Sequence, residues 1–123
     1  MFDLETNQTT HQIIGVLYQV YNTIGYGYQE KYYYRAIKSD LLKLGFTVQE
    51  QLHTPLQYNN QNIGRYFLDF LVNDKIVLEI KVANQIYPQH IRQVLGYLKA
   101  HNLHVGLIAA FTKEGVIVKR VLS

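Results

Sequence analysis

The order of hydrophobic and polar residues predicts two helices at the start of the chain. Apolar side chains recur at intervals of three or four residues over about residues 10–24, and again over about residues 28–44. This spacing places them on one side of a helix, which can then pack against a sheet. Gly25 and Gly45 follow these two segments, in the position where glycine commonly ends a helix.

A shorter period of two residues predicts strands in the middle of the chain. Residues 46–52 alternate between apolar and polar, and Pro55 should end this strand. A hairpin with its turn at Asn59-Asn60 then leads into a central strand over residues 63–72. The apolar segment 76–82 is expected to pair with that strand.

A third helix and two further strands complete the expected order of elements. Pro88 suits the first turn of a helix over residues 89–101, whose apolar positions again follow helical spacing. Residues 104–111 are almost entirely apolar and predict a buried strand. A turn at 113–115 leads to a closing strand over residues 116–121.

The first nine residues are polar and predict a frayed arm over residues 1–9. Thr9 or Thr10 can then cap the first helix. No linker, repeat or low-complexity segment divides the remainder, so we expect one domain over residues 10–123.

Three charged residues lie within the two central strands, where the pattern otherwise predicts a core: Asp69, Glu79 and Lys81. A buried carboxylate without a partner costs several kcal/mol, so these side chains need a partner or a ligand. Carboxylate oxygens are ligands that Mg²⁺ and Mn²⁺ prefer, and a metal site explains all three residues. The alternative is a cross-strand ion pair on a half-exposed sheet, which contributes under about 1 kcal/mol.

The metal hypothesis requires a particular strand register. Asp69 lies directly opposite Glu79, on the same face of the sheet, if Val72 pairs with Ile76 across a three-residue loop. A two-residue turn would place Asp69 on the other face, unless a bulge restored the phase. The sequence therefore predicts an odd loop or a bulge between these strands.

Composition limits the class of protein. The chain has 123 residues, of which 48% are hydrophobic and 17% charged, enough for a globular core. Cysteine is absent, which excludes disulfides and thiolate metal sites. We find neither a leader pattern nor a run near the roughly 20 apolar residues of a membrane span. We therefore expect a cytoplasmic protein without a membrane partner.

The formal net charge of +3 is compatible with a nucleic-acid partner, although the basic residues are spread along the chain. Eleven tyrosines are present, and residues 26–34 contain five of them. Such aromatic side chains can stack on bases, or they can pack a helix against a sheet. The sequence leaves both interpretations open.

Two further residues are candidates for the same site. Glu30 is expected in the first turn of the second helix, where the helix dipole favours a carboxylate whether or not it reaches the site. Gln93 lies near the apolar side of the third helix, so its amide is either satisfied in the core or lines a cleft.

Three ordered motifs link these residues to a known family. Asp69 is followed ten residues later by Glu79 and then Lys81, a D…ExK pattern. The segment GYQEKYY at residues 27–33 and the segment QVLGYLK at residues 93–99 flank it. With the predicted element order, this resembles the PD-(D/E)XK nuclease superfamily, and within it the GxxExxY proteins. The resemblance covers about residues 13–120.

The resemblance implies an α/β (α+β) fold with a restriction-endonuclease-like core, in which a central mixed sheet is flanked by helices in the order α-β-β-β-α-β. It also implies a metal-dependent nuclease that uses Mg²⁺ or Mn²⁺ and acts on nucleic acid, DNA more than RNA. The implied catalytic residues are Glu30, Asp69, Glu79, Lys81 and Gln93. The implied metal ligands are Asp69, Glu79 and the backbone carbonyl of Ile80, with Glu30 as a further candidate.

The sequence departs from the family pattern at two positions. Leu68 stands where a proline would precede the aspartate, and Ala110 stands where we expect an asparagine in the late strand. A catalytically silent module that binds nucleic acid or protein is the alternative function. Because a chain of this size has few elements for reading sequence, a homodimer or a partner protein is expected to supply specificity.

Overall fold

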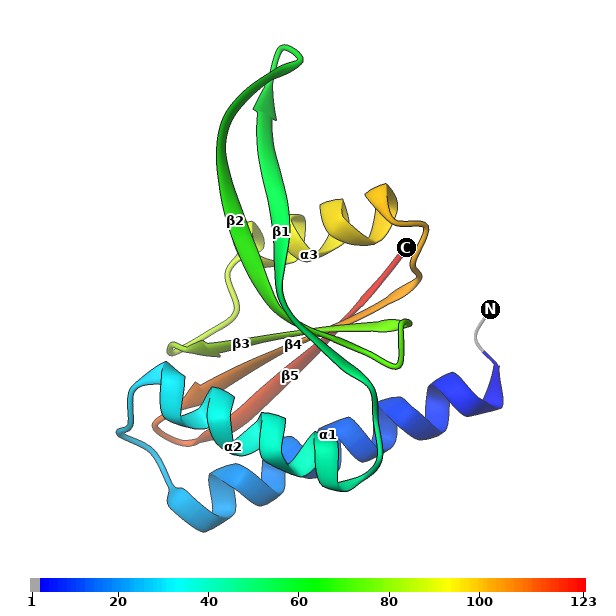
Figure 1. Ribbon diagram of the computed structural model, residues 1–123. Helices are drawn as coiled ribbons and strands as arrows, with labels where there is room; N and C mark the ends of the chain where they lie inside the picture. Colours follow the sequence, from blue (N-terminus) through cyan, green and yellow to red (C-terminus); the bar gives the residue numbers. More distant parts are fainter. Residues whose placement is uncertain (1–2) are drawn as a thin grey trace.

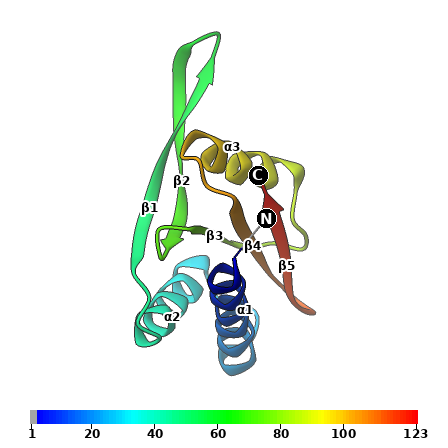
Figure 2. The same ribbon diagram turned by 90° about the vertical axis from the view of Figure 1, so that its right-hand side faces the viewer.

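The structure is a computed structural model that describes residues 3–123, and it has three layers (Figure 1). A five-stranded sheet in the order β1-β2-β3-β4-β5 forms the middle layer. Helices α1 and α2 cover one face of the sheet and α3 covers the other, as Figure 2 shows from the side. The elements are α1 (Leu4–Ile24), α2 (Glu30–Lys43), β1 (Val48–Tyr58), β2 (Gln61–Val72), β3 (Ile76–Val82), α3 (Pro88–Ala100), β4 (Val105–Thr112) and β5 (Gly115–Leu122).

The sheet is mixed, because only one pair of neighbouring strands is parallel. Strands β3 and β4 run parallel and α3 connects them, whereas the other three neighbouring pairs are antiparallel. A parallel pair needs a crossover, and a helix is the usual one. The expected fold class, a mixed sheet flanked by helices in a nuclease-like arrangement, is confirmed.

Helix α1 begins earlier than the sequence pattern predicts. Asp3 is its N-cap and accepts a hydrogen bond from the Thr6 backbone N–H at 2.7 Å. Thr9 and Thr10 are buried within the helix, so neither is its cap. The prediction of a frayed arm over residues 1–9 is therefore wrong from residue 4 onward, and residues 1–2 lie outside the described chain. Polar composition misled us here, because these threonines are small enough to pack on the sheet.

Strands β1 and β2 form a long hairpin that extends well beyond the helices (Figure 1). Pro55 does not end β1, contrary to expectation, but pairs with Arg65 inside the hairpin. Proline is tolerated there because β1 is an edge strand, and one of its sides needs no ladder partner. Asn59 and Asn60 have φ angles of 50° and 64° and form the expected turn.

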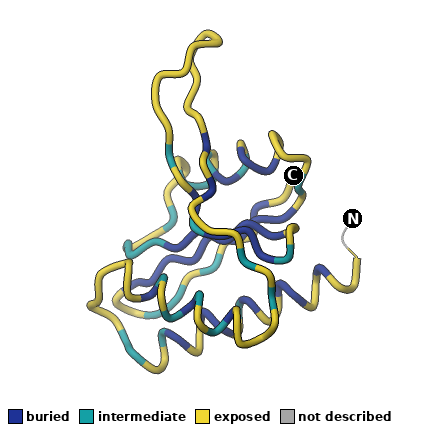
Figure 3. The backbone as a smooth tube through the Cα atoms, viewed as in Figure 1, coloured by how far each residue is buried: buried dark blue, intermediate teal, exposed yellow. Residues whose placement is uncertain are grey.

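Two cores lie on opposite faces of the sheet. The larger lies between the sheet and helices α1 and α2, and the smaller lies between the sheet and α3. All eight residues of β4 are buried, consistent with its central place between the layers (Figure 3). Helix α3 approaches β4 closely at Gly106, where the strand has no side chain. A Cβ atom at this position would lie only 2.5 Å from Cγ1 of Val94 on α3.

Within residues 3–123, the structure contains no helix with the length and apolar character needed to cross a membrane.

Candidate active site

The two central strands separate at Asp69 and Glu79, and their carboxylates replace the missing ladder. Backbone pairing between β2 and β3 extends from Val72–Ile76 to Phe70–Leu78. Beyond it, the Asp69 N–H donates to Glu79 Oε1 at 3.0 Å, and the Ile80 N–H donates to Asp69 Oδ2 at 2.8 Å. Each carboxylate thus holds the backbone of the opposite strand, which fixes both side chains at the point where the strands diverge.

The predicted register is confirmed. Val72 pairs with Ile76, which leaves the three-residue loop 73–75 that the metal hypothesis requires. Asn73 and Asp74 have φ angles of 53° and 57°, a conformation that Asn and Asp adopt more readily than most residues. The loop chemistry therefore fixes the register that brings the two acidic residues together.

Lys81 completes the acidic pair. Its Nζ lies 3.3 Å from Oε2 of Glu79, and the lysine side chain remains partly exposed while the glutamate is buried. The two residues are two apart on β3 and so share a face. The ammonium group therefore lies where a substrate can reach it, beside carboxylates that water reaches poorly.

Burial dominates the electrostatics of this cluster. Desolvation raises the pKa of Glu79 to about 8, with the nearby Asp69 charge as the second cause, and Lys81 offsets only part of this. Desolvation also raises the pKa of Asp69, against the hydrogen bonds from Glu79 and Ile80. Two carboxylates this close disfavour double ionisation, so a cation between them would relieve the cost.

Glu30 approaches the same cluster from α2. It is the first residue of that helix, and its Oε1 accepts a hydrogen bond from the Val82 N–H at the end of β3, at 3.3 Å. Desolvation raises its pKa, with Lys81 opposing and Asp69 adding to the shift. The charges of Lys81 and Asp69 therefore both act on the Glu30 carboxyl.

The local structure explains the GxxExxY motif physically. Gly27 has a φ angle of 110°, which favours glycine, in the turn before α2. Glu30 follows at the helix start, and Tyr33 is fully buried with its ring 4.5 Å from that of Phe111 and its hydroxyl donating to the Gly25 carbonyl. The motif thus anchors the start of α2 so that its carboxylate reaches β3.

Gln93 is less well connected to the cluster than the sequence implied. It is half-buried on α3, and its backbone carbonyl accepts a hydrogen bond from the Tyr66 hydroxyl at 3.0 Å. Among residues 3–123, no hydrogen bond links its side chain to the acidic pair. Ala110 is fully buried beside Lys81 in the β3–β4 ladder, so that position offers no polar side chain.

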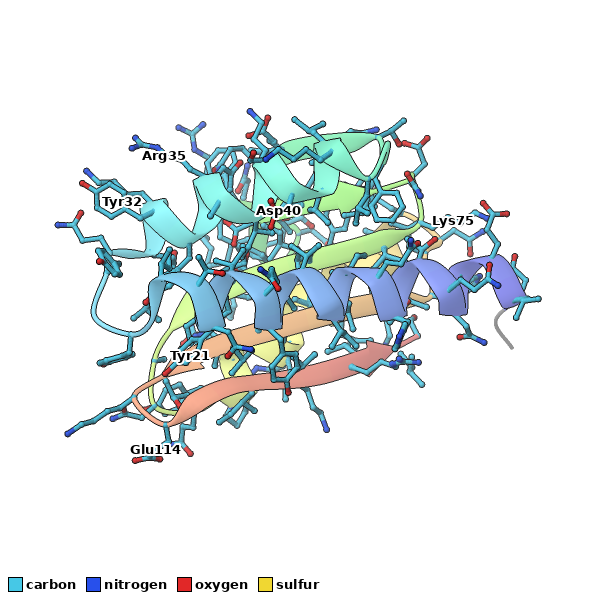
Figure 4. All side chains as sticks on the ribbon, turned by 90° about the horizontal axis from the view of Figure 1, so that it is seen from below. Tyr21, Tyr32, Arg35, Asp40, Lys75 and Glu114 are labelled. Carbon is cyan, nitrogen blue, oxygen red and sulfur yellow. The ribbon has the colours of Figure 1, made fainter. Side chains whose placement is uncertain are left out.

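A cleft opens from Asp69 and Glu30 along α2, and most of its other lining residues were not among the site residues predicted from the sequence. Its volume is about 590 Å³. The residues that line it are Glu30, Lys31, Tyr34, Arg35, Lys38, Gln51, Phe67 and Asp69. Lys31, Arg35 and Lys38 have the spacing of one helix face, a signal that was present in the sequence. Tyr32 and Arg35 project from the side of α2 away from α1 (Figure 4).

The donor set suits a hard divalent cation. Asp69 and Glu79 supply two carboxylates, and the Ile80 carbonyl lies between Glu79 and Lys81 in sequence. In the part of the chain that the structure describes, no three Asp, Glu or His side chains gather closely enough to form a complete metal cage. Mg²⁺ usually keeps several water ligands and takes one or two carboxylates, so two protein carboxylates fit it.

Comparison with known proteins agrees with the fold. A family model described as the PD-(D/E)XK nuclease superfamily matches residues 7–121. The chain belongs to the PD-(D/E)XK nuclease superfamily. The crystal structure of SSO0001 has a similar fold, with a TM-score of 0.56 at 18% identity. The match covers 76% of this chain and 50% of SSO0001, so this chain spans half of that protein. No curated protein matches the chain.

Proposed function

We propose that this PD-(D/E)XK protein is a metal-dependent nuclease of the GxxExxY group that hydrolyses phosphodiester bonds in nucleic acid, DNA in preference to RNA. The observation that carries the proposal is the cross-strand arrangement of Asp69 and Glu79 beside Lys81, with Asp69 lining a cleft whose walls also include Lys31, Arg35 and Lys38. An ordinary surface ion pair needs neither buried carboxylates nor a cleft.

The residues have separate roles in this proposal. Asp69, Glu79 and the Ile80 carbonyl hold Mg²⁺ or Mn²⁺, which supplies Lewis-acid activation of the phosphodiester and of water. Lys81 orients the attacking water or stabilises negative charge on the phosphate, because its Nζ lies 3.3 Å from Oε2 of Glu79 and its side chain remains partly exposed. Glu30 acts as an outer acceptor or a ligand to a second ion.

Gln93 is proposed to steady water or the scissile phosphate. Its half-buried position on α3 leaves the side chain partly accessible. Of the five proposed catalytic residues it has the least structural support.

The test compares cleavage by the wild type and by Asp69→Asn. Substrates are linear and circular DNA, single-stranded DNA and RNA, each with Mg²⁺, with Mn²⁺ and with EDTA. Asparagine keeps an oxygen that can accept the Ile80 N–H, so the fold should survive while a charged ligand is lost. We expect metal-dependent cleavage that disappears in Asp69→Asn.

Asp74→Asn is the matched control, because Asp74 lies in the β2–β3 loop and its Oδ1 accepts a hydrogen bond from Gln49 that asparagine can also accept. It should cut like the wild type. If no protein cuts any substrate, or if all three cut equally with EDTA present, the nuclease proposal fails, and a silent binding module with this fold takes its place.

A further inference from the structure

The outer end of the β1–β2 hairpin, residues 55–65, is exposed and packs in neither core. We call residues 53–67 the arm. Beyond the Leu52–Leu68 pair, which packs in the smaller core, Thr54 is buried and Tyr66 is half-buried, and every other residue of the arm is exposed (Figure 3). The six residues of β1 beyond Leu52 extend it by roughly 20 Å, at about 3.3 Å per residue. A two-stranded ribbon without support is only marginally stable in water, so its length calls for a partner.

The tip of the arm exposes apolar side chains to solvent. Leu56, Tyr58 and Ile63 have exposed fractions of 48%, 65% and 59%. The turn explains Asn59 and Asn60, whose φ angles are positive, but it does not require these three apolar residues. Exposed apolar groups gathered on one projecting element indicate a contact surface.

The charge of the arm identifies the kind of partner. Residues 51–68 contain no Asp, Glu or Lys. Their titratable basic residues are Arg65 and His53. Five amide side chains surround the turn, namely Gln57, Asn59, Asn60, Gln61 and Asn62. Amides and apolar residues without carboxylates suit the grooves of nucleic acid, where amides bond base edges and apolar residues wedge between bases.

One face of the arm continues the wall of the cleft. Opposed pairs Thr54–Tyr66 and Leu52–Leu68 share the face that carries the α3 contacts, so His53–Phe67 and Pro55–Arg65 lie on the other face. Phe67 lines the cleft with Asp69, and the rings of His53 and Phe67 are 5.5 Å apart. Arg65 lies over the Phe67 ring at 5.6 Å. The arm thus leads directly to the acidic pair.

The opposite wall supplies positive charge. Lys31 and Arg35 lie over the Tyr32 ring, at 5.2 Å and 5.7 Å from its centroid, and neither forms a salt bridge with any residue of the described range 3–123. Lys38 is paired with Glu50 at 2.8 Å, which neutralises the nearest carboxylate on β1. Unpaired cations on one helix face are suited to phosphate contacts.

We propose that the arm enters a groove of double-stranded DNA while Lys31 and Arg35 hold the phosphate backbone, so that one strand reaches Asp69 and Glu79. This inference rests on the proposed nuclease function for the role of the acidic pair. A two-stranded ribbon fits the major groove of B-form DNA, which is about 12 Å wide, whereas the major groove of A-form RNA is too narrow for side chains. The arm thereby selects duplex DNA.

The experiment shortens the arm without disturbing the core. Residues 55–65 are replaced by Asn-Gly, which joins Thr54 to Tyr66; because these two residues are directly opposed, a two-residue turn suits them. The double variant Tyr58→Ser/Ile63→Ser keeps the arm and removes apolar surface. Leu122→Ser, which changes an exposed leucine on β5, is its control. Thermal melting establishes that each variant is folded.

Binding is measured by fluorescence anisotropy in EDTA, in the Asp69→Asn background so that no substrate is cut. The probes are a labelled DNA duplex, the same sequence as single-stranded DNA, and the same sequence as an RNA duplex. We expect the full arm to bind duplex DNA about 10-fold more tightly than the other two probes. The shortened arm should lose this preference, the double variant should lose part of it, and the control should retain it.

The proposal is overturned if the shortened arm binds duplex DNA as tightly as the full arm, or if the RNA duplex binds equally well. It is also overturned if shortening converts a dimer to a monomer in sedimentation while duplex affinity is unchanged, because the arm then docks on a second copy of the chain.

Cleavage with Mn²⁺ separates this inference from the proposed function. Arm-independent cleavage of every substrate leaves the nuclease standing and refutes the role of the arm. Arm-dependent duplex binding without cleavage by any protein refutes the nuclease and leaves the arm as a DNA-binding element.

Discussion

Two groups of one lysine and two carboxylates lie at opposite ends of the paired part of β2 and β3. At the open end, Lys81 lies beside Glu79 and Asp69; at the loop end, Lys75 lies 3.9 Å from Asp3 and 3.7 Å from Glu5 (Figure 4). The composition is the same, but the glutamate side chain is 4% exposed in the first group and 75% exposed in the second.

The different exposure changes the electrostatics of the two groups. In the open-end group, desolvation raises the pKa of both carboxyls. In the loop-end group, the pKa of Asp3 is lowered, because its carboxylate accepts the Thr6 N–H at the helix cap. Surrounding structure, and not residue type, therefore decides which group can bind an ion and which is an ordinary surface ion pair.

The largest expected difference is in cleavage. Lys81→Met should lower the rate of metal-dependent DNA cleavage by roughly 100- to 1,000-fold, since a charged group beside the phosphate is lost. Lys75→Met should cleave like the wild type. Initial rates with Mg²⁺ on a plasmid substrate measure both, and equal rates for the two variants would refute the assignment of Lys81.

The second difference is in how the free energy of unfolding depends on pH in the absence of metal. The folded-state pKa of Glu79 lies above its value in the unfolded chain, so the folded protein binds the extra proton and is stabilised below about pH 4.5. That stabilisation should be lost progressively as pH rises through about 8. Urea unfolding in EDTA should show a fall of a few kcal/mol across this window.

Glu79→Gln should flatten that profile, because glutamine resembles the protonated form and cannot ionise. Glu5→Gln is the comparison at the loop end, and its profile should keep the wild-type slope. A fall of the same size in Glu79→Gln would assign the pH dependence to another group.

The third difference is in metal-linked stability. If the proposed site binds Mg²⁺ or Mn²⁺ in the folded state alone, a metal concentration about 100 times the dissociation constant should stabilise the protein by about 2.7 kcal/mol. Thermal melting should show this shift in the wild type and in Glu5→Gln, but not in Asp69→Asn. A shift that persists in Asp69→Asn would place the ion elsewhere.

The smallest effect is expected from breaking the loop-end group. Lys75→Ala removes both of its ion pairs, but exposed pairs contribute little, so the melting temperature should change by less than about 2 °C. The change should shrink further in high salt, where surface charges are screened. A loss of several degrees would mean that this group stabilises the fold.

Sequence reasoning succeeded where one physical constraint had few solutions. Placing Asp69 and Glu79 on one side required a three-residue loop, and the structure has it. The two helices before the strands and the buried strand β4 also followed from periodicity, because their apolar faces are long.

Sequence reasoning failed where tertiary context overrides the local preference of a residue. Pro55 continues β1 because that strand lies at an edge, which depends on the sheet order and not on the nearby residues. The helix cap at Asp3 was missed because Thr9 and Thr10 offered equally good caps. The basic lining of the cleft was missed because Lys31, Arg35 and Lys38 face Phe67 only after folding brings α2 and β2 together.

The fully buried strand β4 has a consequence for how the chain folds. Its eight residues need α1 and α2 on one face, α3 on the other, β3 at one edge and β5 at the other. During synthesis β5 is made after β4, so β4 emerges as a continuous apolar segment with an open edge before its second partner exists. Such a segment is a site of aggregation, and chains interrupted near residue 112 should depend on chaperones far more than chains that include β5.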